Sequence, residues 1–245
     1  AVLTLNRPEA LNALSFSILG DIGRALDEVA EMKDIRALLV TGAGDKAFCA
    51  GADIKELRGR ALIEQKRGAE LGQSVFAKLD SLPVASVALV NGYAFGGGSE
   101  LALACTFRLA SPNAVFGLPE IKLGLIPGYG GTQRLPRLIG EGRALEIIMT
   151  GRNVKAEEAE RIGLVNAIAE GDLMEAGREF AGKFTRYSLP VLECARSAVQ
   201  RGGDVTLAEG LRIEADLSTL AFRTADAEEG MAAFEEKRKA EFKDG

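Results

Sequence analysis

The chain of 245 residues contains no histidine. Histidine is the side chain that most often moves protons near neutral pH, so an enzyme with this sequence must use other groups for acid–base chemistry. The absence also excludes a Ser–His catalytic triad and removes a common nitrogen ligand of zinc. Carboxyl groups whose pKa is raised by an apolar environment are the natural substitutes.

Cysteine is also scarce, with only Cys49, Cys105 and Cys194 and no CxxC pair. Their odd number, wide spacing and apolar neighbours predict buried free thiols in a reducing compartment rather than disulfides. With so few thiols and no imidazole, we expect no metal site.

Long apolar runs are absent as well, because Glu and Arg residues interrupt every stretch, and we expect no membrane span. A net charge of −5 argues against a broad nucleic-acid surface. The chain begins inside a strand-like run, so we expect further residues before Ala1. A bacterial cytoplasmic location is expected, and a mitochondrial one stays open.

The residues that are present predict strand–helix units first and helices last, which is typical of an α/β core followed by a helical part. Strands are expected at residues 2–5, 35–41, 84–90, 107–110 and 115–116, and helices at 15–32, 61–79 and 99–105, with one more opened by Asp53. Further helices are expected at 133–139, 143–150, 156–162, 173–185, 191–200, 207–220 and 227–239, with a short strand at 165–168.

Two glycine-containing segments, 47–53 and 92–98, read as loops that follow a strand and lead into a helix. Such loops present free backbone N–H groups at a helix N-terminus, and glycine lets a ligand approach them closely. Two N–H groups facing each other would form an oxyanion hole. Strand–glycine–helix turns are common in α/β folds, so either loop alone is weak evidence. No dinucleotide fingerprint, P-loop or nucleophile elbow occurs.

Glu100 and Glu120 are the candidate proton-transfer groups. Glu100 follows Gly96-Gly97-Gly98-Ser99, and its apolar neighbours imply that the carboxyl group needs a role or a partner. Glu120 follows Gly117-Leu118-Pro119 and precedes the turn-rich segment 126–132. Two structural alternatives remain at this point: Glu100 complements a helix dipole, and Glu120 pairs with Lys122.

Five ordered segments resemble the crotonase superfamily and, within it, enoyl-CoA hydratase. They are 6–14 (NRPEALNAL), 47–54 (AFCAGADI), 96–102 (GGGSELA), 119–124 (PEIKLG) and 127–135 (PGYGGTQRL), and the similarity continues to 229–234 (EGMAAF). The resemblance implies an α/β spiral of ββα units at residues 1–185 and a C-terminal helical trimerisation region at 186–245. It also implies a homo-hexamer built as a dimer of trimers.

The activity implied by the resemblance is reversible hydration of 2-enoyl-CoA to 3-hydroxyacyl-CoA. Glu100 would handle the water, Glu120 the proton at C2, and the N–H groups of Ala52 and Gly97 would form the oxyanion hole. Substrate-binding residues would be Ala50, Asp53, Ile54, Leu57, Phe95, Gly96 and Tyr129. No metal or redox cofactor is implied, since coenzyme A is part of the substrate.

Two alternatives to hydration stay open: an enoyl-CoA isomerase, and an RNA-binding, weakly catalytic relative. Arg7, Lys55 and Arg58 are candidates for holding the CoA phosphates, and Lys239 or Lys243 for reaching a neighbouring site. The depth of the site around Leu57, Phe95, Tyr129 and Leu135 would set the acyl chain length. Ser99 and Thr106 depart from the family pattern, which more often has an apolar residue and an aspartate there.

Overall fold

The computed structural model describes all residues from Ala1 to Gly245, and they divide into two compact units, Ala1–Arg178 and Glu179–Gly245. The boundary lies within helix α8 (Leu173–Thr185). A division between a spiral core and a trimerisation region after residue 185 stays a prediction. No helix combines the length and the apolar character that crossing a membrane requires.

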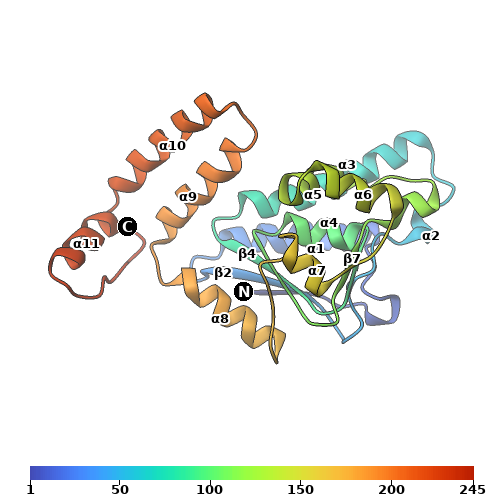
Figure 1. Cartoon of the computed structure of the whole chain (residues 1–245), viewed down its shortest axis with the longest axis horizontal. Helices are drawn as coiled ribbons and strands as arrows, with labels where there is room; N and C mark the ends of the chain where they lie inside the picture. The colour runs from blue at the N-terminus through green and yellow to red at the C-terminus, as the bar shows by residue number, and fades with distance from the viewer. The chain divides into compact units, whose positions relative to one another are not determined.

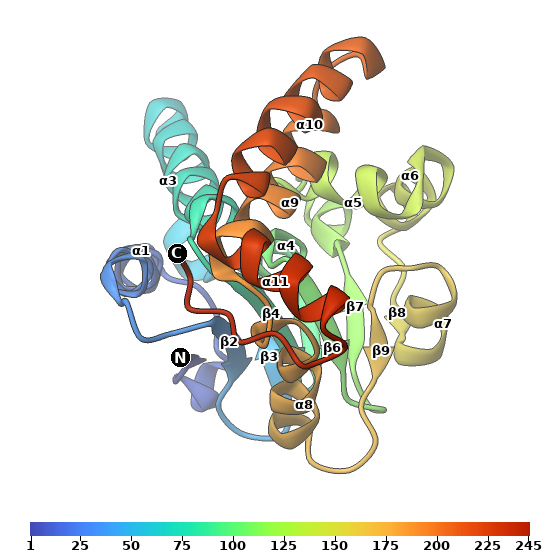
Figure 2. The same cartoon turned by 90° about the vertical axis from the view of Figure 1, so that its left-hand side faces the viewer.

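The first unit contains two sheets. One has the strand order β1 (Val2–Leu5), β2 (Ala37–Gly42), β4 (Ala85–Val90), β6 (Phe107–Ala110) and β9 (Ala167–Ile168), all parallel. The other has the order β3 (Ala47–Cys49), β5 (Tyr93–Phe95), β7 (Val115–Gly117) and β8 (Val154–Lys155), of which only β8 is antiparallel to its neighbour. Figure 2 shows β2, β4 and β6 in the first sheet and β7 and β8 in the second.

The chain alternates between the sheets in three successive units. In each unit one strand joins the first sheet, the next joins the second, and a helical segment follows: β2–β3–α2, β4–β5–α4 and β6–β7–η2. This repetition is the spiral of ββα units that the sequence predicted. Parallel strands must be covered on both faces, which explains why β4 is almost entirely buried.

Helices cover the sheets, and α4 is the most enclosed of them. The helical segments of this unit are η1 (Pro8–Ala10), α1 (Phe16–Glu31), α2 (Ile54–Leu57), α3 (Leu62–Ser81), α4 (Gly97–Ala104), η2 (Pro119–Leu123), α5 (Gly131–Ile139), α6 (Glu141–Thr150) and α7 (Ala156–Arg161). Every residue of α4 is buried, because the helix contacts β3 and β5 as well as α3 and α5 (Figure 1). A helix enclosed in this way fixes its side chains accurately.

Close packing at the start of α4 depends on Gly98. A Cβ atom at Gly98 would overlap with the carbonyl oxygen of Cys49 at the end of β3. Only glycine therefore allows α4 to approach β3 this closely. The contact places the N-terminus of α4 directly against the segment that follows β3.

The expected elements are present, with several corrections. The segments 47–53 and 92–98, predicted as loops, contain the strands β3 and β5, which are too short to show an alternating pattern. The strand expected at 35–41 begins only at Ala37, and the last helix ends at Glu235 rather than at residue 239. Cys49 and Cys105 are buried free thiols as predicted, whereas Cys194 is only half-buried.

The second unit contains α9 (Leu189–Gly202), α10 (Leu207–Phe222) and α11 (Ala225–Glu235). Helices α9 and α10 pack against each other as a hairpin. Neither contains a fully buried residue, and large apolar side chains are exposed on both: Val199, Leu207, Leu211, Leu220 and Phe222. Phe234 is exposed in the same way on α11. Asp226 ties the end of the chain to α11, because its carboxylate accepts from the N–H groups of Lys243 and Asp244 at 2.7 and 2.9 Å.

The packing of α4 on β3 predicts opposite effects for two Gly→Ala substitutions. Gly98→Ala forces the helix away from the backbone of β3, and we expect it to destabilise the fold by more than about 3 kcal/mol. Gly142→Ala in α6 meets no atom within 4 Å and should stabilise the protein by about 0.5–1 kcal/mol. Urea denaturation of both variants measures the difference. Equal stability of the two would contradict this packing.

Candidate active site

Glu100 projects from the first turns of α4 into the interior and is only 2% exposed. Its Oε1 atom accepts two backbone hydrogen bonds, from the N–H of Tyr129 and the N–H of Gly131, both at 2.8 Å. These donors belong to the turn that leads into α5, whose residue Gly130 has a φ of +117°. The turn therefore supplies two fixed N–H donors to one carboxyl oxygen.

Glu120 lies in η2, which follows directly after β7. Its Oε2 atom is buried and has no hydrogen-bond partner. Its other oxygen, Oε1, would lie 2.9 Å from a Cβ atom at Gly96, so glycine at that position gives the carboxyl group its space. Glu120 forms no ion pair with Lys122, which rules out the structural alternative for this residue.

The two carboxyl groups influence each other. The pKa of Glu100 is raised to about 7, mainly by burial and to a smaller extent by the charge of Glu120, while the N–H groups of Gly131 and Tyr129 act in the opposite direction. Burial also raises the pKa of Glu120 above its usual value. Because burial raises the pKa of both groups and the charge of Glu120 raises that of Glu100, the pair holds a proton near neutral pH more readily than two exposed glutamates would.

The two glycine-rich segments lie side by side. A Cβ atom at Gly51 would lie 2.9 Å from the Phe95 carbonyl oxygen and 3.7 Å from the Gly97 nitrogen, and Gly51 has a φ of +105°. Leu14 forms a parallel bridge to Ala52 through the carbonyl of Gly51 and the N–H of Asp53. This bridge does not use the N–H of Ala52, and the N–H of Gly97 is at the start of α4, where no intrahelical acceptor exists.

The short helix α2 begins immediately after Ala52. Asp53 caps it by accepting from the N–H of Lys55 at 3.1 Å, as the sequence predicted for a helix opened by this residue. The Asp53 carboxylate also accepts from Arg7 at 3.0 Å, and this guanidinium lowers the pKa of Asp53. Arg7 is therefore already paired, whereas Lys55 and Arg58 are exposed.

The remaining site residues predicted from the sequence lie on these same segments. Ala50 is held by a hydrogen bond from its N–H to the Leu11 carbonyl at 3.0 Å, and Ile54 is half-exposed on α2, followed by the partly buried Leu57. The Phe95 ring stacks on Tyr93, with ring centroids 5.2 Å apart. The Tyr129 ring meets Phe76 edge-on, with centroids 5.8 Å apart.

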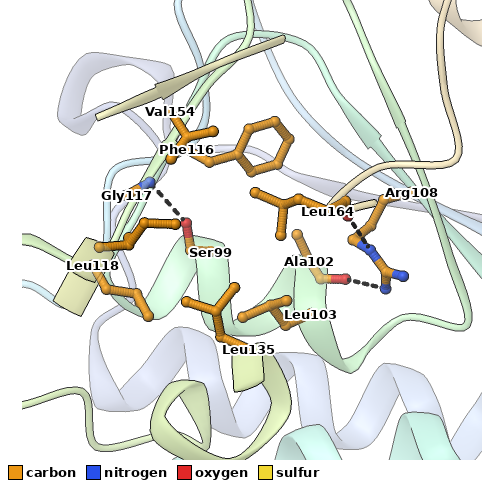
Figure 3. A pocket seen from close by; sticks show the side chains of 11 residues that line it. Ser99, Ala102, Leu103, Arg108, Phe116, Gly117, Leu118, Leu135, Val154 and Leu164 are labelled. Atoms are coloured by element: carbon orange, nitrogen blue, oxygen red, sulfur yellow. Dashed lines mark hydrogen bonds between the residues drawn. The ribbon is translucent and has the colours of Figure 1, made fainter. Parts of the chain in front are cut away.

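Ser99 connects the segments that carry the two glutamates. Its hydroxyl donates to the carbonyl of Ala94 in β5 at 2.6 Å. It also accepts from the N–H of Gly117 in β7 at 3.2 Å, the bond drawn in Figure 3. Glu100 follows Ser99 directly, and Glu120 follows Gly117 by three residues. The polar residue that departs from the family pattern thus links α4 to both neighbouring strands.

A cavity of about 10 Å³ lies beside Ser99, between α4, β7 and α5 (Figure 3). Leu103, Phe116 and Leu135 are among the side chains around it. Because this volume corresponds to about one water molecule, it cannot hold an acyl chain. Leu135, which the sequence placed at the depth of the acyl site, lines this small cavity.

Arg108 is buried at the opposite end of α4 and is 6% exposed. Its guanidinium donates to three carbonyl oxygens, those of Leu164 at 2.8 Å, Cys105 at 2.7 Å and Ala102 at 3.4 Å. Figure 3 shows the bonds to Leu164 and Ala102. Two of these carbonyls belong to the C-terminal end of α4, where a cation is favourable.

Thr106 and Ser86 exchange hydrogen bonds, with each hydroxyl accepting from the other residue's N–H at 3.2 and 3.0 Å.

Three features of the site were not predicted from the sequence: the donors to Glu100 at Tyr129 and Gly131, the role of Ser99, and the close approach of Gly51 to Phe95. The glycines of segment 128–131 were the available signal for the first. No cluster of three or more His, Cys, Asp or Glu residues could hold a metal ion.

Comparison with known proteins is consistent across sequence and structure. The family model described as enoyl-CoA hydratase/isomerase matches residues 1–245. The chain is 43% identical to the short-chain-enoyl-CoA hydratase of Clostridium acetobutylicum over 242 residues, which is 98% of this chain and 93% of that protein. It is 42% identical to the crotonyl-CoA hydratase of Syntrophomonas wolfei over 243 residues, covering 99% and 94% of the two chains.

Among solved structures, the enoyl-CoA hydratase from Bacillus anthracis matches with a TM-score of 0.94 and 40% sequence identity. The match covers 100% of this chain and 95% of that one. The similarity therefore includes the C-terminal helices as well as the two sheets.

The two hydrogen bonds of Ser99 predict a specific stability loss. Ser99→Ala leaves the buried N–H of Gly117 without its acceptor, and we expect a cost of about 1–3 kcal/mol. Ser74 is an exposed serine whose hydroxyl bonds only to a carbonyl within its own helix, and Ser74→Ala should change stability by less than about 0.5 kcal/mol. Chemical denaturation compares them, and a similar loss in both would count against the linking role.

The raised pKa of Glu100 predicts a pH-dependent stability change. The buried site favours the protonated carboxyl group, so its contribution to the free energy of unfolding is fully present below the usual pKa of 4.5. This contribution is lost as pH rises through about 7, where Glu100 ionises in the folded protein. Glu100→Gln stays neutral, so the difference in unfolding free energy should move in favour of the variant by on the order of 1–3 kcal/mol from pH 5 to pH 8. Denaturation at both pH values measures this shift, and a constant difference would show that Glu100 titrates normally.

Proposed function

The chain belongs to the enoyl-CoA hydratase/isomerase family, and we propose that Glu100 and Glu120 together carry out its reaction, the reversible addition of water across C2=C3 of a 2-enoyl-CoA. The predicted enoyl-CoA hydratase function, that of a hydro-lyase, is confirmed by the curated relatives, and the predicted crotonase-like fold by the structural matches. The roles of the individual residues are our proposal.

In this proposal Glu100 activates the water. Its Oε1 accepts two backbone N–H groups, which favour the ionised carboxylate and hold it in one orientation. The carboxylate takes a proton from the water as the water oxygen forms its bond to C3. A base whose pKa lies near neutral pH suits this task.

Glu120 is the proton donor to C2. Its Oε2 is buried without a partner, an environment that favours the protonated carboxyl group. As the proton moves to C2, Glu120 becomes ionised while Glu100 has become protonated. Hydration thus leaves Glu100 protonated and Glu120 ionised. The starting protonation states are restored by the reverse reaction or by proton exchange with solvent.

The N–H groups of Ala52 and Gly97 are the proposed donors to the thioester oxygen. Negative charge develops on this oxygen when water attacks C3, and the position of Gly97 at the N-terminus of α4 adds the favourable end of the helix dipole. Each donor of this kind contributes roughly 3–4 kcal/mol to transition-state stabilisation. Ala50, Asp53, Ile54, Leu57, Phe95, Gly96 and Tyr129 are the proposed substrate-binding residues around these donors.

The single observation that carries this assignment is the presence of two carboxyl groups in one site, the buried Glu100 and Glu120 with its buried, unpartnered Oε2 atom, and burial raises the pKa of both. An isomerase reaction needs only one such group, so the second favours hydration. Nothing in the site favours RNA binding over an acyl-CoA thioester. The reaction as proposed needs no cofactor, because coenzyme A arrives as part of the substrate.

We further propose a homo-hexamer built from trimers and a cytoplasmic location. The exposed apolar side chains of α9 and α10 support an assembly in which the second unit is covered by other copies of the chain. Bacterial relatives support the location. Lys55 and Arg58, both exposed after the proposed oxyanion hole, remain candidates for contacting the CoA phosphates, as do Lys239 and Lys243 from a neighbouring copy.

Kinetics with crotonyl-CoA test the proposal. Glu100→Gln and Glu120→Gln should each lower kcat by about 10²–10⁴-fold, the usual contribution of a positioned acid or base. Glu28→Gln, an exposed residue of α1, should leave turnover unchanged. Loss of the enoyl absorbance follows hydration directly. Wild-type turnover in either active-site variant would overturn the assignment, and shifting of a double bond without hydration would favour the isomerase.

A further inference from the structure

Two glycines one turn apart on α3 make room for two aromatic rings. A Cβ atom at Gly72 would overlap with the ring of Tyr129, and one at Gly68 would lie 2.7 Å from the ring of Phe16. Glycine within a helix costs about 1 kcal/mol relative to alanine. Both rings therefore pack directly on the backbone of α3. A side chain larger than hydrogen at position 68 or 72 would fill the space that each ring occupies.

The Tyr129 ring is held from several sides. It meets Phe76 of α3 edge-on at an interplanar angle of 89°, and a Cβ atom at Gly97 would lie 3.1 Å from its Cδ2 atom. The residue is 7% exposed. The ring therefore fills the space between α3 and the first turn of α4, and it has little room to move.

The same residue contacts both parts of the proposed chemistry. Its backbone N–H donates to Glu100 at 2.8 Å, and its ring lies against Gly97, the proposed donor to the thioester oxygen. In the proposed reaction the thioester oxygen lies at Gly97 and C3 lies at Glu100, so the Tyr129 ring borders the route of the acyl carbons beyond C3. The ring thus occupies space that a long chain would need.

We propose that Tyr129, seated against Gly72, closes the acyl end of the site and restricts this chain to short 2-enoyl-CoA thioesters. The inference rests on the proposed function, because it places the acyl chain beside Gly97 and Glu100. It adds the substrate class, which the two glutamates alone do not specify. Side-chain volume, rather than a polar contact, performs the discrimination.

The test compares crotonyl-CoA with 2-decenoyl-CoA. Tyr129→Ala removes the ring but keeps the backbone N–H that donates to Glu100. We expect the ratio of kcat/KM for decenoyl-CoA to that for crotonyl-CoA to rise at least about tenfold, a discrimination that a few methylene contacts provide. Tyr129→Phe keeps the ring and should keep the wild-type ratio. Tyr129→Leu, with an intermediate volume, should fall between them and serves if the alanine variant does not fold.

An unchanged ratio in folded Tyr129→Ala or Tyr129→Leu would overturn the proposal. A purely structural role would lower activity toward both substrates equally, so the ratio separates the two roles. Thermal melting establishes that each variant is folded.

Calorimetry with butyryl-CoA and decanoyl-CoA gives a readout that does not require hydration. Wild-type protein should bind butyryl-CoA more tightly, and Tyr129→Ala should lose this preference. Equal wild-type affinity for both would contradict the restriction by Tyr129. A wild-type protein that shows the binding preference but hydrates neither enoyl substrate would refute the proposed function and leave the acyl restriction standing.

Discussion

A carboxyl group can be buried only if the chain supplies it with hydrogen-bond donors, and much of the first unit is arranged to do this for Glu100. The turn before α5 presents the N–H groups of Tyr129 and Gly131 to one oxygen. Gly98 brings α4 close to β3, and Ser99 ties it to β5 and β7. If α4 shifted, these contacts and the carboxylate orientation would be lost together.

Burial of the two carboxyl groups lowers the stability of the folded protein near neutral pH but gives the groups pKa values suited to proton transfer. Burial raises the pKa of Glu100 to about 7 and that of Glu120 above its usual value, so the fold disfavours the charge that catalysis requires. An ionised Glu120 raises the pKa of Glu100, which favours the state of the pair with one proton near neutral pH. The absence of histidine is thereby compensated by environment rather than by another residue type.

The sequence predicted the parts of the site that depend on local pattern. Asp53 was correctly predicted to open a helix. The glycine-containing segments indicated free N–H groups at helix N-termini, and their assignment to Ala52 and Gly97, which the family resemblance implies, stays a prediction. Prediction failed for β3 and β5, since three residues are too few to show periodicity. It also missed what Ser99 bonds to and why position 72 is glycine, because those partners lie 18 and 57 residues away in the chain.

The buried Arg108 has a consequence for recovery from acid. Its guanidinium holds the carbonyl oxygens at the C-terminal end of α4, and arginine keeps its charge throughout the range in which carboxyl groups titrate. Although burial lowers the pKa of Arg108, this attachment does not depend on a carboxylate that protonation could release. Protonation of Glu100 and Glu120 at low pH therefore removes the catalytic base while α4 stays attached through Arg108. Activity lost on brief acidification should return when the pH is raised again.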